Sequence, residues 1–292
     1  MKNSIGFIGL GVMGRPMALH YQSVAGPLLV WTRSQQTRDE FAAGGSTVAA
    51  TAAEVFETCD TIILMLGSAD ALDQVLGRGT DRFTRFCAGK TLIQMATTLP
   101  GYSKSLEADI LAAGGRYAEV PVSGSSVPAA SGKLILMHAG DPQTLADIAP
   151  IVAPFAEACV TCGAVPSALQ LKLAVNICLT GVFTGLVEGM NFARQCGIDL
   201  TLFQNVLEAG QLSSPLLKMK MPKLVEEDYS AQASVEQAVN NLKMMKAAGK
   251  EAGAFMPIVA TALERQQRML ELGHGDLDAV AAIMAYRELN GT

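Results

Sequence analysis

The chain has 292 residues, of which half are hydrophobic and 17% are charged, and its formal net charge is −5 at pH 7. This length exceeds what one compact core usually needs, so we expect two domains, and the composition excludes a disordered or fibrous protein. The acidic balance gives no electrostatic reason to expect a nucleic-acid partner.

The first half of the chain alternates short apolar runs with stretches of helical pattern. The runs are too short for helices and rich in β-branched or large apolar residues, which is typical of buried strands. They lie at 4–9, 28–32, 61–66, 91–95, 117–122 and 133–140. This alternation predicts an α/β fold with a doubly wound parallel sheet, covered by helices on both faces.

The character of the chain changes after about Pro166, where a long helical pattern begins. Everything downstream reads as helices, which are interrupted at 213–215, 226–230 and 273–276. We therefore expect a sheet domain over 1–165 and an all-α domain over 166–292, joined by one long interdomain helix.

The longest uncharged apolar run spans 173–187 and lies between Lys172 and Glu188. A bilayer span needs about 20 apolar residues, so this run predicts a buried helix and no membrane partner. Met1 and Lys2 lead directly into a strand pattern without the layout of a signal peptide. We therefore expect a cytoplasmic protein.

Six cysteines in a chain of this length do not indicate a disulfide framework. Cys159 and Cys162 form a C-x-x-C in a strand-like stretch, with no second pair and no histidine cluster. A structural pair of reduced thiols is favoured over metal binding or redox chemistry, and we expect no metal site.

Three glycines near the N-terminus, Gly9, Gly11 and Gly14, have the spacing G-x-G-x-x-G. A strand-like run precedes them and a helical pattern follows, which favours a dinucleotide-binding turn over a glycine-rich bend without ligand. In this interpretation Gly9 permits the tight turn, Gly11 lets the backbone approach a pyrophosphate, and Gly14 lets the helix pack on the strand. The predicted cofactor loop comprises Gly9, Gly11, Val12, Met13 and Gly14.

The end of the second strand indicates which nucleotide binds there. An NAD site places an Asp or Glu at this point to hold the ribose 2′-hydroxyl, but no carboxylate lies between Val30 and Arg38. Thr32, Arg33 and Ser34 stand there instead, and a guanidinium beside a hydroxyl suits a 2′-phosphate. We expect NADP(H) to be preferred over NAD(H); the alternative is a solvated arginine at a strand end.

A serine-rich loop follows the strand predicted at 117–122. The small residues Ser123, Gly124 and Ser125 can expose backbone N–H groups that hold a carboxylate. Taken alone, however, this pattern is more typical of a plain turn.

Lys172 and Asn176 lie four residues apart and therefore share one face of the long, otherwise apolar helix. One interpretation is a snorkelling lysine near the helix start, with a hydrogen-bonded asparagine. The other is catalysis: hydride arriving at a carbonyl carbon leaves charge on oxygen, to which a lysine ammonium donates a proton. Partial burial would lower the lysine pKa, and Asn176 would orient the lysine or the substrate.

Four motifs in order, "GFIGLGVMGRPMA", "WTRS", "PVSGS…PAASGKL" and "KLAVN", resemble those of the β-hydroxyacid dehydrogenases over essentially the whole chain. They are most similar to the NADPH-dependent glyoxylate and succinic semialdehyde reductases of that family. The resemblance implies a Rossmann-type domain followed by a helical domain, a small carboxylate-bearing substrate, and assembly as a homodimer or homotetramer.

The resemblance also implies roles for individual residues. Lys172 matches the catalytic lysine and Asn176 the asparagine beside it, while Ser123 and Gly124 match the binders of the substrate carboxylate. The remaining matches are cofactor contacts, at Met65, Leu66 and Thr97. The implied activity is reversible hydride transfer between NADPH and a small aldehyde or keto acid, with Lys172 as general acid and base.

Three departures from the family pattern affect the expected substrate and rate. Asn240-Asn241-Leu242 replaces a Lys-Asp-Leu on a late helix, Pro166-Ser167-Ala168 replaces a glycine pair, and Gly67 replaces a proline. Two alternatives stay open: an imine reductase, although such enzymes typically lack the lysine, and a catalytically silent NADP-binding scaffold.

Overall fold

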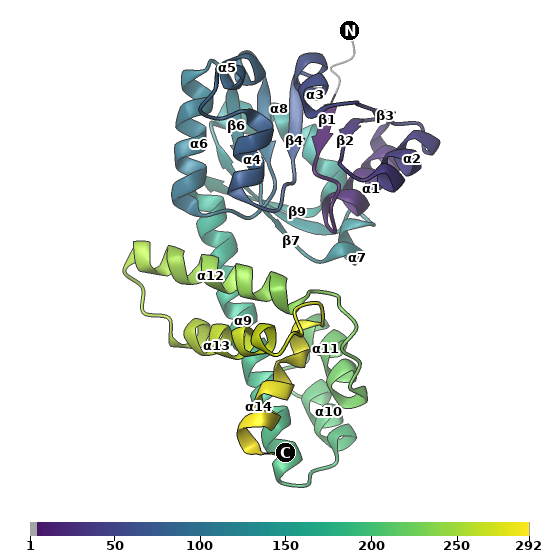
Figure 1. The fold of residues 1–292 in the computed structure, drawn as a ribbon, viewed down its shortest axis with the longest axis vertical. Coiled ribbons are helices and arrows are strands. Elements are labelled where there is room, and N and C mark those ends of the chain that lie inside the picture. Colours follow the sequence, from purple (N-terminus) through teal and green to yellow (C-terminus); the bar gives the residue numbers. More distant parts are fainter. Residues whose placement is uncertain (1–4, 292) are drawn as a thin grey trace. The chain divides into compact units, whose positions relative to one another are not determined.

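The computed structural model describes residues 5–291, and contacts within the chain divide it into two compact units, Met1–Leu173 and Ala174–Thr292. The division falls inside one long helix, downstream of the 165/166 boundary expected from the sequence, which stays a prediction. Figure 1 shows the fold of each unit.

The first unit contains a nine-stranded sheet in the order β3-β2-β1-β4-β5-β6-β8-β7, with β9 also pairing with β8. The strands are β1 (Ile5–Ile8), β2 (Leu29–Trp31), β3 (Thr47–Val48), β4 (Thr61–Leu64), β5 (Thr91–Gln94), β6 (Arg116–Glu119), β7 (Val122–Ser123), β8 (Leu134–Gly140) and β9 (Ala156–Gly163). The pairs from β3 to β6 are all parallel, as predicted.

Helices cover both faces of this sheet (Figure 1). They are α1 (Gly14–Ala25), α2 (Gln35–Ala43), α3 (Ala52–Thr58), α4 (Ala69–Leu76), α5 (Asp81–Cys87), α6 (Pro100–Ala112), α7 (Ser126–Ala129), α8 (Pro142–Val152) and the 3-10 turn η1 (Ala153–Phe155). Successive strand residues point to opposite faces, so Phe7 enters a core with α1 and α8, and Ile8 enters a core with α3 to α6. Burial on both faces explains the continuous apolar runs in the sequence.

The parallel strands end in register at one edge of the sheet. Ile8 pairs with Trp31 of β2 and with Leu64 of β4, Leu64 pairs with Gln94, and Gln94 pairs with Glu119. The strand order reverses direction at β1 and β4, and ligands of open α/β sheets bind outside the carboxyl ends of the strands at such a point. The edge formed by these five strand ends is called here the carboxyl edge.

The run at 117–122, expected to be one strand, forms two. β6 ends at Glu119 and β7 begins at Val122, because Pro121 lies between them and cannot donate to a ladder. β8 is antiparallel to both β6 and β7. The sheet is therefore mixed at this end, although the pattern of apolar residues predicted only that it continued.

The second unit is all-helical, as predicted, and it begins within α9. Its helices are α9 (Ser167–Gln195), α10 (Leu200–Ala209), α11 (Pro215–Glu226), α12 (Val235–Ala252), α13 (Pro257–Glu271), the 3-10 turn η2 (Ala279–Ala281) and α14 (Ala282–Asn290). The three predicted interruptions separate helices. Two further breaks fall at 196–199, between α9 and α10, and at Gly253, whose left-handed backbone ends α12.

A buried ion pair joins three segments of this unit. Lys220 Nζ of α11 donates to both oxygens of Asp278, at 2.9 Å each. Asp278 also accepts from the N–H groups of Gln232 and Val280, at 2.8 and 3.1 Å. Desolvation opposes the charge on this carboxylate, but the bonds from Lys220 and the backbone outweigh it, so its pKa is lowered.

The expectation of a buried helix over 173–187 is wrong in one respect. The segment is helical, but only 22% of the most apolar 18-residue window of α9 is buried, and Leu179 and Val182 are exposed. Within one chain, only one stripe of α9 packs, with α11 and α14, into the core of this unit. Outside that stripe, Ala168, Leu169 and Leu173 at the start of α9 are also buried, whereas Leu179 and Val182 stay exposed among the described residues.

By length and composition, α9 is the one helix among residues 5–291 that could cross a membrane, with a mean hydropathy of 1.5 over that window. One such helix is weak evidence for a membrane span, because helices of soluble proteins pass the same test.

Candidate functional site

The glycine loop leaves β1 at the carboxyl edge. Gly9 has φ of +104°, and a Cβ on it would overlap the backbone carbonyl of Met65, while a Cβ on Gly14 would overlap the carbonyl of Gly9. Gly11, by contrast, is exposed and has open space around its Cα. Two glycines therefore close the loop, and the third leaves the backbone accessible to a ligand.

The beginning of α1 lies directly after this loop. Its N-cap residue is Met13, and no side chain caps the helix. Unpaired N–H groups and the helix dipole at such a terminus favour an anion. The loop thus fits the pyrophosphate of a dinucleotide, and Val12, which is exposed, lies within it.

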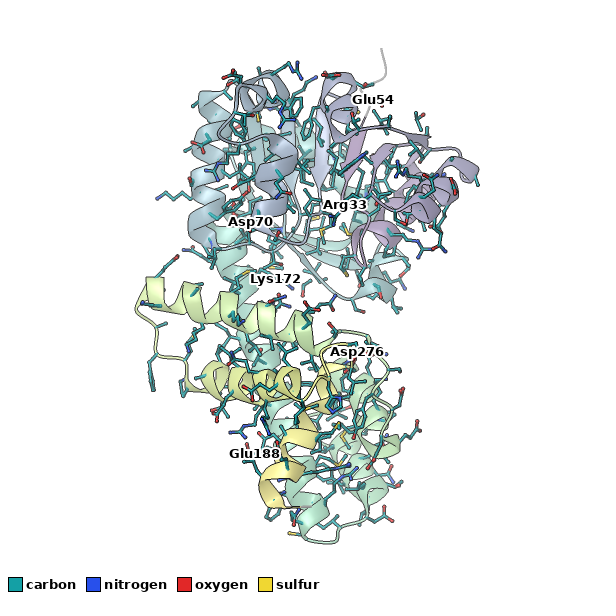
Figure 2. The ribbon with its side chains drawn as sticks, viewed as in Figure 1. Arg33, Glu54, Asp70, Lys172, Glu188 and Asp276 are labelled. Atoms are coloured by element: carbon teal, nitrogen blue, oxygen red, sulfur yellow. The ribbon has the colours of Figure 1, made fainter. Side chains whose placement is uncertain are left out.

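Thr32, Arg33 and Ser34 follow β2 at the same edge. Ser34 caps α2 by accepting from the Thr37 N–H at 3.3 Å, and the Arg33 carbonyl accepts from Arg38 Nη2 at 3.1 Å. Among residues 5–291, no hydrogen bond or ion pair engages the exposed Arg33 guanidinium, which Figure 2 labels beyond β2. This side chain is available to a ligand.

A carboxylate near this position is neutralised by a salt bridge. Glu40 of α2 accepts from Arg15 Nε and Nη2, each at 2.6 Å, and these bonds lower the pKa of Glu40. Arg15 and Glu40, with Gln36 and Thr37, line a hollow of about 490 Å³. A phosphate near Ser34 would therefore not face the repulsion of an unpaired carboxylate, because Glu40 is paired with Arg15.

The three other predicted cofactor contacts follow strands that end at the same edge. Met65 and Leu66 follow β4 and are half-buried, and the Met65 N–H donates to the Ile8 carbonyl at 2.8 Å. Thr97 follows β5 and is half-buried. The structure thus gathers the loops after β1, β2, β4 and β5 at the carboxyl edge.

The serine loop begins at the end of β7. Gly124 has φ of +138°, a conformation that L side chains rarely adopt, so the sharp turn favours glycine. Ser123 and Ser125 are half-buried on either side of it. Within the described chain, neither hydroxyl has a hydrogen-bond partner, so both are free to bind a polar ligand.

Lys172 lies near the start of α9, where Figure 2 labels it, and is 8% exposed. Burial lowers its pKa from 10.5 to about 8. Across residues 5–291 no acidic side chain forms an ion pair with it. A buried ammonium without a counter-ion is unfavourable, and an exposure of 8% is low for a snorkelling lysine with a solvated head.

Asn176 lies four residues further along the same helix and is half-buried. It belongs to the second unit, whereas Lys172 belongs to the first. On the late helix α12, Asn240 and Asn241 are exposed and Leu242 is buried.

The first turn of α9 is held by a residue that the sequence did not single out. Oε1 of Glu119, the last residue of β6, accepts from the Leu169 N–H at 2.7 Å. The bond places the start of the lysine-bearing helix at the carboxyl edge. An acid at the end of a short apolar run is the only signal of this role in the sequence, and it reads equally well as a surface residue.

The cysteine pair lies on β9, and both sulfurs are free thiols. Burial raises the pKa of each, and Cys162 also interacts with the negative charge of Glu119. Among the described residues, no three His, Cys, Asp or Glu side chains cluster as metal ligands would.

Two family models match the chain. The first, described as the NAD-binding domain of 6-phosphogluconate dehydrogenase, covers residues 4–163. The second, described as the NAD-binding domain of NADP-dependent 3-hydroxyisobutyrate dehydrogenase, covers residues 167–286.

Several relatives are similar along nearly the whole chain. Glyoxylate/succinic semialdehyde reductase 1 of Arabidopsis thaliana is 30% identical over 97% of this chain and 98% of its own length. Cytokine-like nuclear factor N-PAC of Xenopus tropicalis is 28% identical over 97% of this chain, which spans 53% of that protein. The structure of a Mycobacterium tuberculosis 3-hydroxyisobutyrate dehydrogenase with L-serine superposes with a TM-score of 0.86 at 22% identity, covering 98% of this chain and 100% of that one. That likeness confirms the predicted fold.

Proposed function

Since the chain belongs to the β-hydroxyacid dehydrogenase family of NAD(P)-binding oxidoreductases, we propose that it reduces a small aldehyde or keto acid with NADPH, reversibly. Glyoxylate and semialdehyde acids are the proposed substrate class. The observation that carries the proposal is a buried, unpaired Lys172 with a lowered pKa, on a helix anchored at the carboxyl edge.

Lys172 acts as the general acid and base in this proposal. A nicotinamide cofactor, when bound, would supply the hydride chemistry at the carbonyl carbon. The Lys172 ammonium donates its proton to the oxygen on which charge develops, and the neutral amine takes a proton from the hydroxyl in the reverse direction. A pKa of about 8 keeps both forms of the amine accessible near neutral pH. Asn176 orients the lysine or the substrate.

The serine loop is the proposed binder of the substrate carboxylate. Ser123 and Ser125 have free hydroxyls, and the turn at Gly124 exposes the backbone to a ligand. Hydrogen bonds to an ionised acceptor are about twice as strong as neutral ones, so this loop would select substrates with a carboxylate.

The cofactor residues proposed are those at the carboxyl edge. Gly9, Gly11, Val12, Met13 and Gly14 would hold the pyrophosphate; Met65, Leu66 and Thr97 would contact the nicotinamide half. Thr32, Arg33 and Ser34 would bind the 2′-phosphate, and the free Arg33 guanidinium supports NADP(H) over NAD(H).

A homodimer or homotetramer is also proposed. Helix α10 has no buried residue within one chain, and its Leu202 and Val206 are 59% and 64% exposed. Leu179 and Val182 of α9 are exposed as well, and we propose that a second copy of the chain covers these apolar side chains. Light scattering tests this assembly, and Val206→Glu should lower the mass measured in solution. A monomeric mass for the parent protein would contradict the proposal.

The remaining proposals concern setting. The net charge of −5 gives no electrostatic support for a nucleic-acid partner, and no membrane partner is proposed. A small anionic substrate would bind locally, through backbone N–H groups or a few cationic side chains. A cytoplasmic location, expected from the sequence, completes the proposal.

The activity is tested by NADPH oxidation with glyoxylate, succinic semialdehyde, tartronate semialdehyde and methylmalonate semialdehyde, with NADH in parallel. Turnover of at least one acid is expected, and Lys172→Ala should abolish most of it. Lys133→Ala, which alters an exposed lysine, serves as the matched control. Full turnover by Lys172→Ala would show that another group supplies the proton.

Two other functions give different outcomes in this assay. A reductase of cyclic imines would act on an imine panel and ignore the semialdehydes, and the presence of Lys172 argues against it. A silent scaffold would bind NADPH tightly without turning over any acid. The replacement of the late lysine by Asn240, and the likeness to a protein named as a nuclear factor and not as an enzyme, are the observations behind this second alternative.

A further inference from the structure

At the start of α9, the Ser167 N–H donates to the Ala164 carbonyl at 2.9 Å, within the segment that leads into the helix. The residue before its first turn is Pro166, whose side chain offers no acceptor, while Ala168 and Leu169 are both fully buried. The N–H groups of a first helical turn need partners from outside the helix, and leaving them unpaired in a core is unfavourable. Such a terminus requires an acceptor from elsewhere in the chain.

Glu119 supplies that acceptor from a strand 50 residues earlier. Its Oε1 accepts from the Leu169 N–H at 2.7 Å, and the neighbouring Ala168 N–H also acts to lower the pKa of the carboxylate. A carboxylate at this end of a helix is further favoured by the helix dipole. Glu119 thus does for α9 what an N-cap side chain usually does.

The second oxygen of the same carboxylate is held by α6. Ser103 Oγ donates to Glu119 Oε2 at 2.5 Å and lies 2.8 Å from the Tyr117 hydroxyl. Glu119, Ser103 and Tyr117 are all buried. The acceptor is therefore fixed on both sides, and it can fix the helix in turn.

The surroundings of the carboxylate are acidic or neutral. Burial raises the pKa of Glu119, the bonds from Ser103 and the α9 backbone lower it, and the charge of Glu107 on α6 raises it further. The other titratable groups that interact with it are Tyr117 on its own strand and Cys162 on β9. In the described chain, Glu119 forms no salt bridge, so its bonding capacity is directed to α6 and α9.

Lys172 follows Leu169 by three residues and therefore lies one turn further on the same side of α9. A helix is stiff over one turn, so a change at Leu169 moves Lys172 with it. We infer that Glu119 is a positioning residue for Lys172, and that its hydrogen bonds to the first turn of α9 set the depth and rotation at which the lysine is presented. This inference rests on the proposed function for the catalytic role of Lys172.

The test reads out Lys172 directly. The reactivity of its amine toward acetic anhydride is followed across pH by peptide mass spectrometry, in the full-length chain and in Glu119→Ala and Glu119→Gln. We expect the parent amine to titrate near the lowered value of about 8, and Glu119→Ala to move it toward 10.5, because a displaced lysine gains solvent. Glu119→Gln should stay close to the parent, since its amide keeps an oxygen for Leu169 and can donate to Ser103.

A purely structural role is separated by a matched control. Val55→Ala removes a buried side chain of α3 from the same core and should lower the melting temperature without changing the Lys172 titration. With an accepted substrate, Glu119→Ala should lower kcat by about 10- to 100-fold, as small misplacements of reacting groups do, while the KM for NADPH stays near the parent value. An equal shift of the Lys172 pKa in Val55→Ala would overturn the inference.

An unchanged pKa of Lys172 in Glu119→Ala would also overturn the inference. If Glu119→Ala does not fold, Ser103→Ala takes its place, because it removes only the hydrogen bond to Glu119 Oε2. This variant should raise the pKa of Lys172 as well, but by less. Failure of the proposed function is recognised separately. If Lys172→Ala keeps full turnover, the lysine is not the acid, but the labelling result still decides whether Glu119 positions it.

Discussion

The carbonyl oxygen of Met65 occupies the space in which a side chain on Gly9 would begin. The loops after β1 and β4 therefore touch at the point where the strand order reverses. Gly11, two residues away, has no neighbour within reach of an added Cβ. These two glycines allow packing and ligand binding to be separated by experiment.

Gly9→Ala should lower both stability and cofactor binding. The substitution forces a side chain onto the Met65 backbone at a φ of +104°, and the backbone strain alone is about 1–3 kcal/mol. Gly11→Ala should leave urea unfolding nearly unchanged and weaken NADPH binding, measured by fluorescence titration. Equal loss of stability in both variants would contradict this assignment.

Arg33→Ala should weaken NADPH binding and leave NADH binding unchanged. A guanidinium–phosphate contact contributes about 1.5–3 kcal/mol, or roughly 10- to 100-fold in affinity. Arg85→Ala, an exposed arginine of α5, is the control. A parallel loss of both nucleotides in Arg33→Ala would mean that Arg33 does not read the 2′-phosphate.

The two directions of the reaction should depend oppositely on pH. Reduction needs the Lys172 ammonium, so its kcat should fall as pH rises through about 8. Oxidation needs the neutral amine, so its kcat should rise through the same pH. The dependence of kcat on pH, measured in both directions, checks this prediction. If kcat in either direction changed instead near pH 10.5, the lysine would titrate as a solvated lysine does.

Lys172→Met should stabilise the protein while removing its activity. The lowering of the pKa from 10.5 to about 8 corresponds to a penalty of about 3 kcal/mol for the buried charge. This penalty is complete below pH 8 and disappears as pH rises to about 10.5, because the folded state releases the proton first. Urea unfolding should therefore show an advantage for Lys172→Met at pH 7 that shrinks at pH 10.

Asp278→Asn should destabilise the helical unit strongly. Removing one partner of a buried ion pair typically leaves a penalty of about 3–5 kcal/mol, here on the Lys220 ammonium. Asp228→Asn, which alters an exposed acid paired with Lys223, should have a smaller effect. Thermal unfolding of the two variants provides the comparison.

The fold was predictable because its signals are local. Apolar runs of strand length and a glycine turn at the right place were enough to predict β1, β4 and β5. The antiparallel pairing of β8 with β6 and β7 could not be predicted, because a buried strand has the same apolar run whether its partners are parallel or antiparallel. The exposure of α9 was also hidden, since hydropathy records that a surface is apolar but not what covers it.

The candidate site divides in the same way. Gly9, Arg33 and Lys172 are residues whose type is unusual at their position, and the sequence alone could single them out. Glu119 acts through a contact with Leu169 that spans 50 residues, and no short-range pattern marks it. Long-range capping of this kind becomes visible only when the strand end and the helix start are placed together.

The aligned strand ends at Trp31, Ile8, Leu64, Gln94 and Glu119 carry a practical consequence for engineering. The sheet ladders stop at these residues, and the loops beyond them carry the groups assigned to cofactor recognition. Thr32 and Arg33 could therefore be exchanged for acidic residues without altering a sheet ladder, whereas Ser34 should be kept because it caps α2; under the proposed function, this exchange would shift coenzyme choice toward NAD(H).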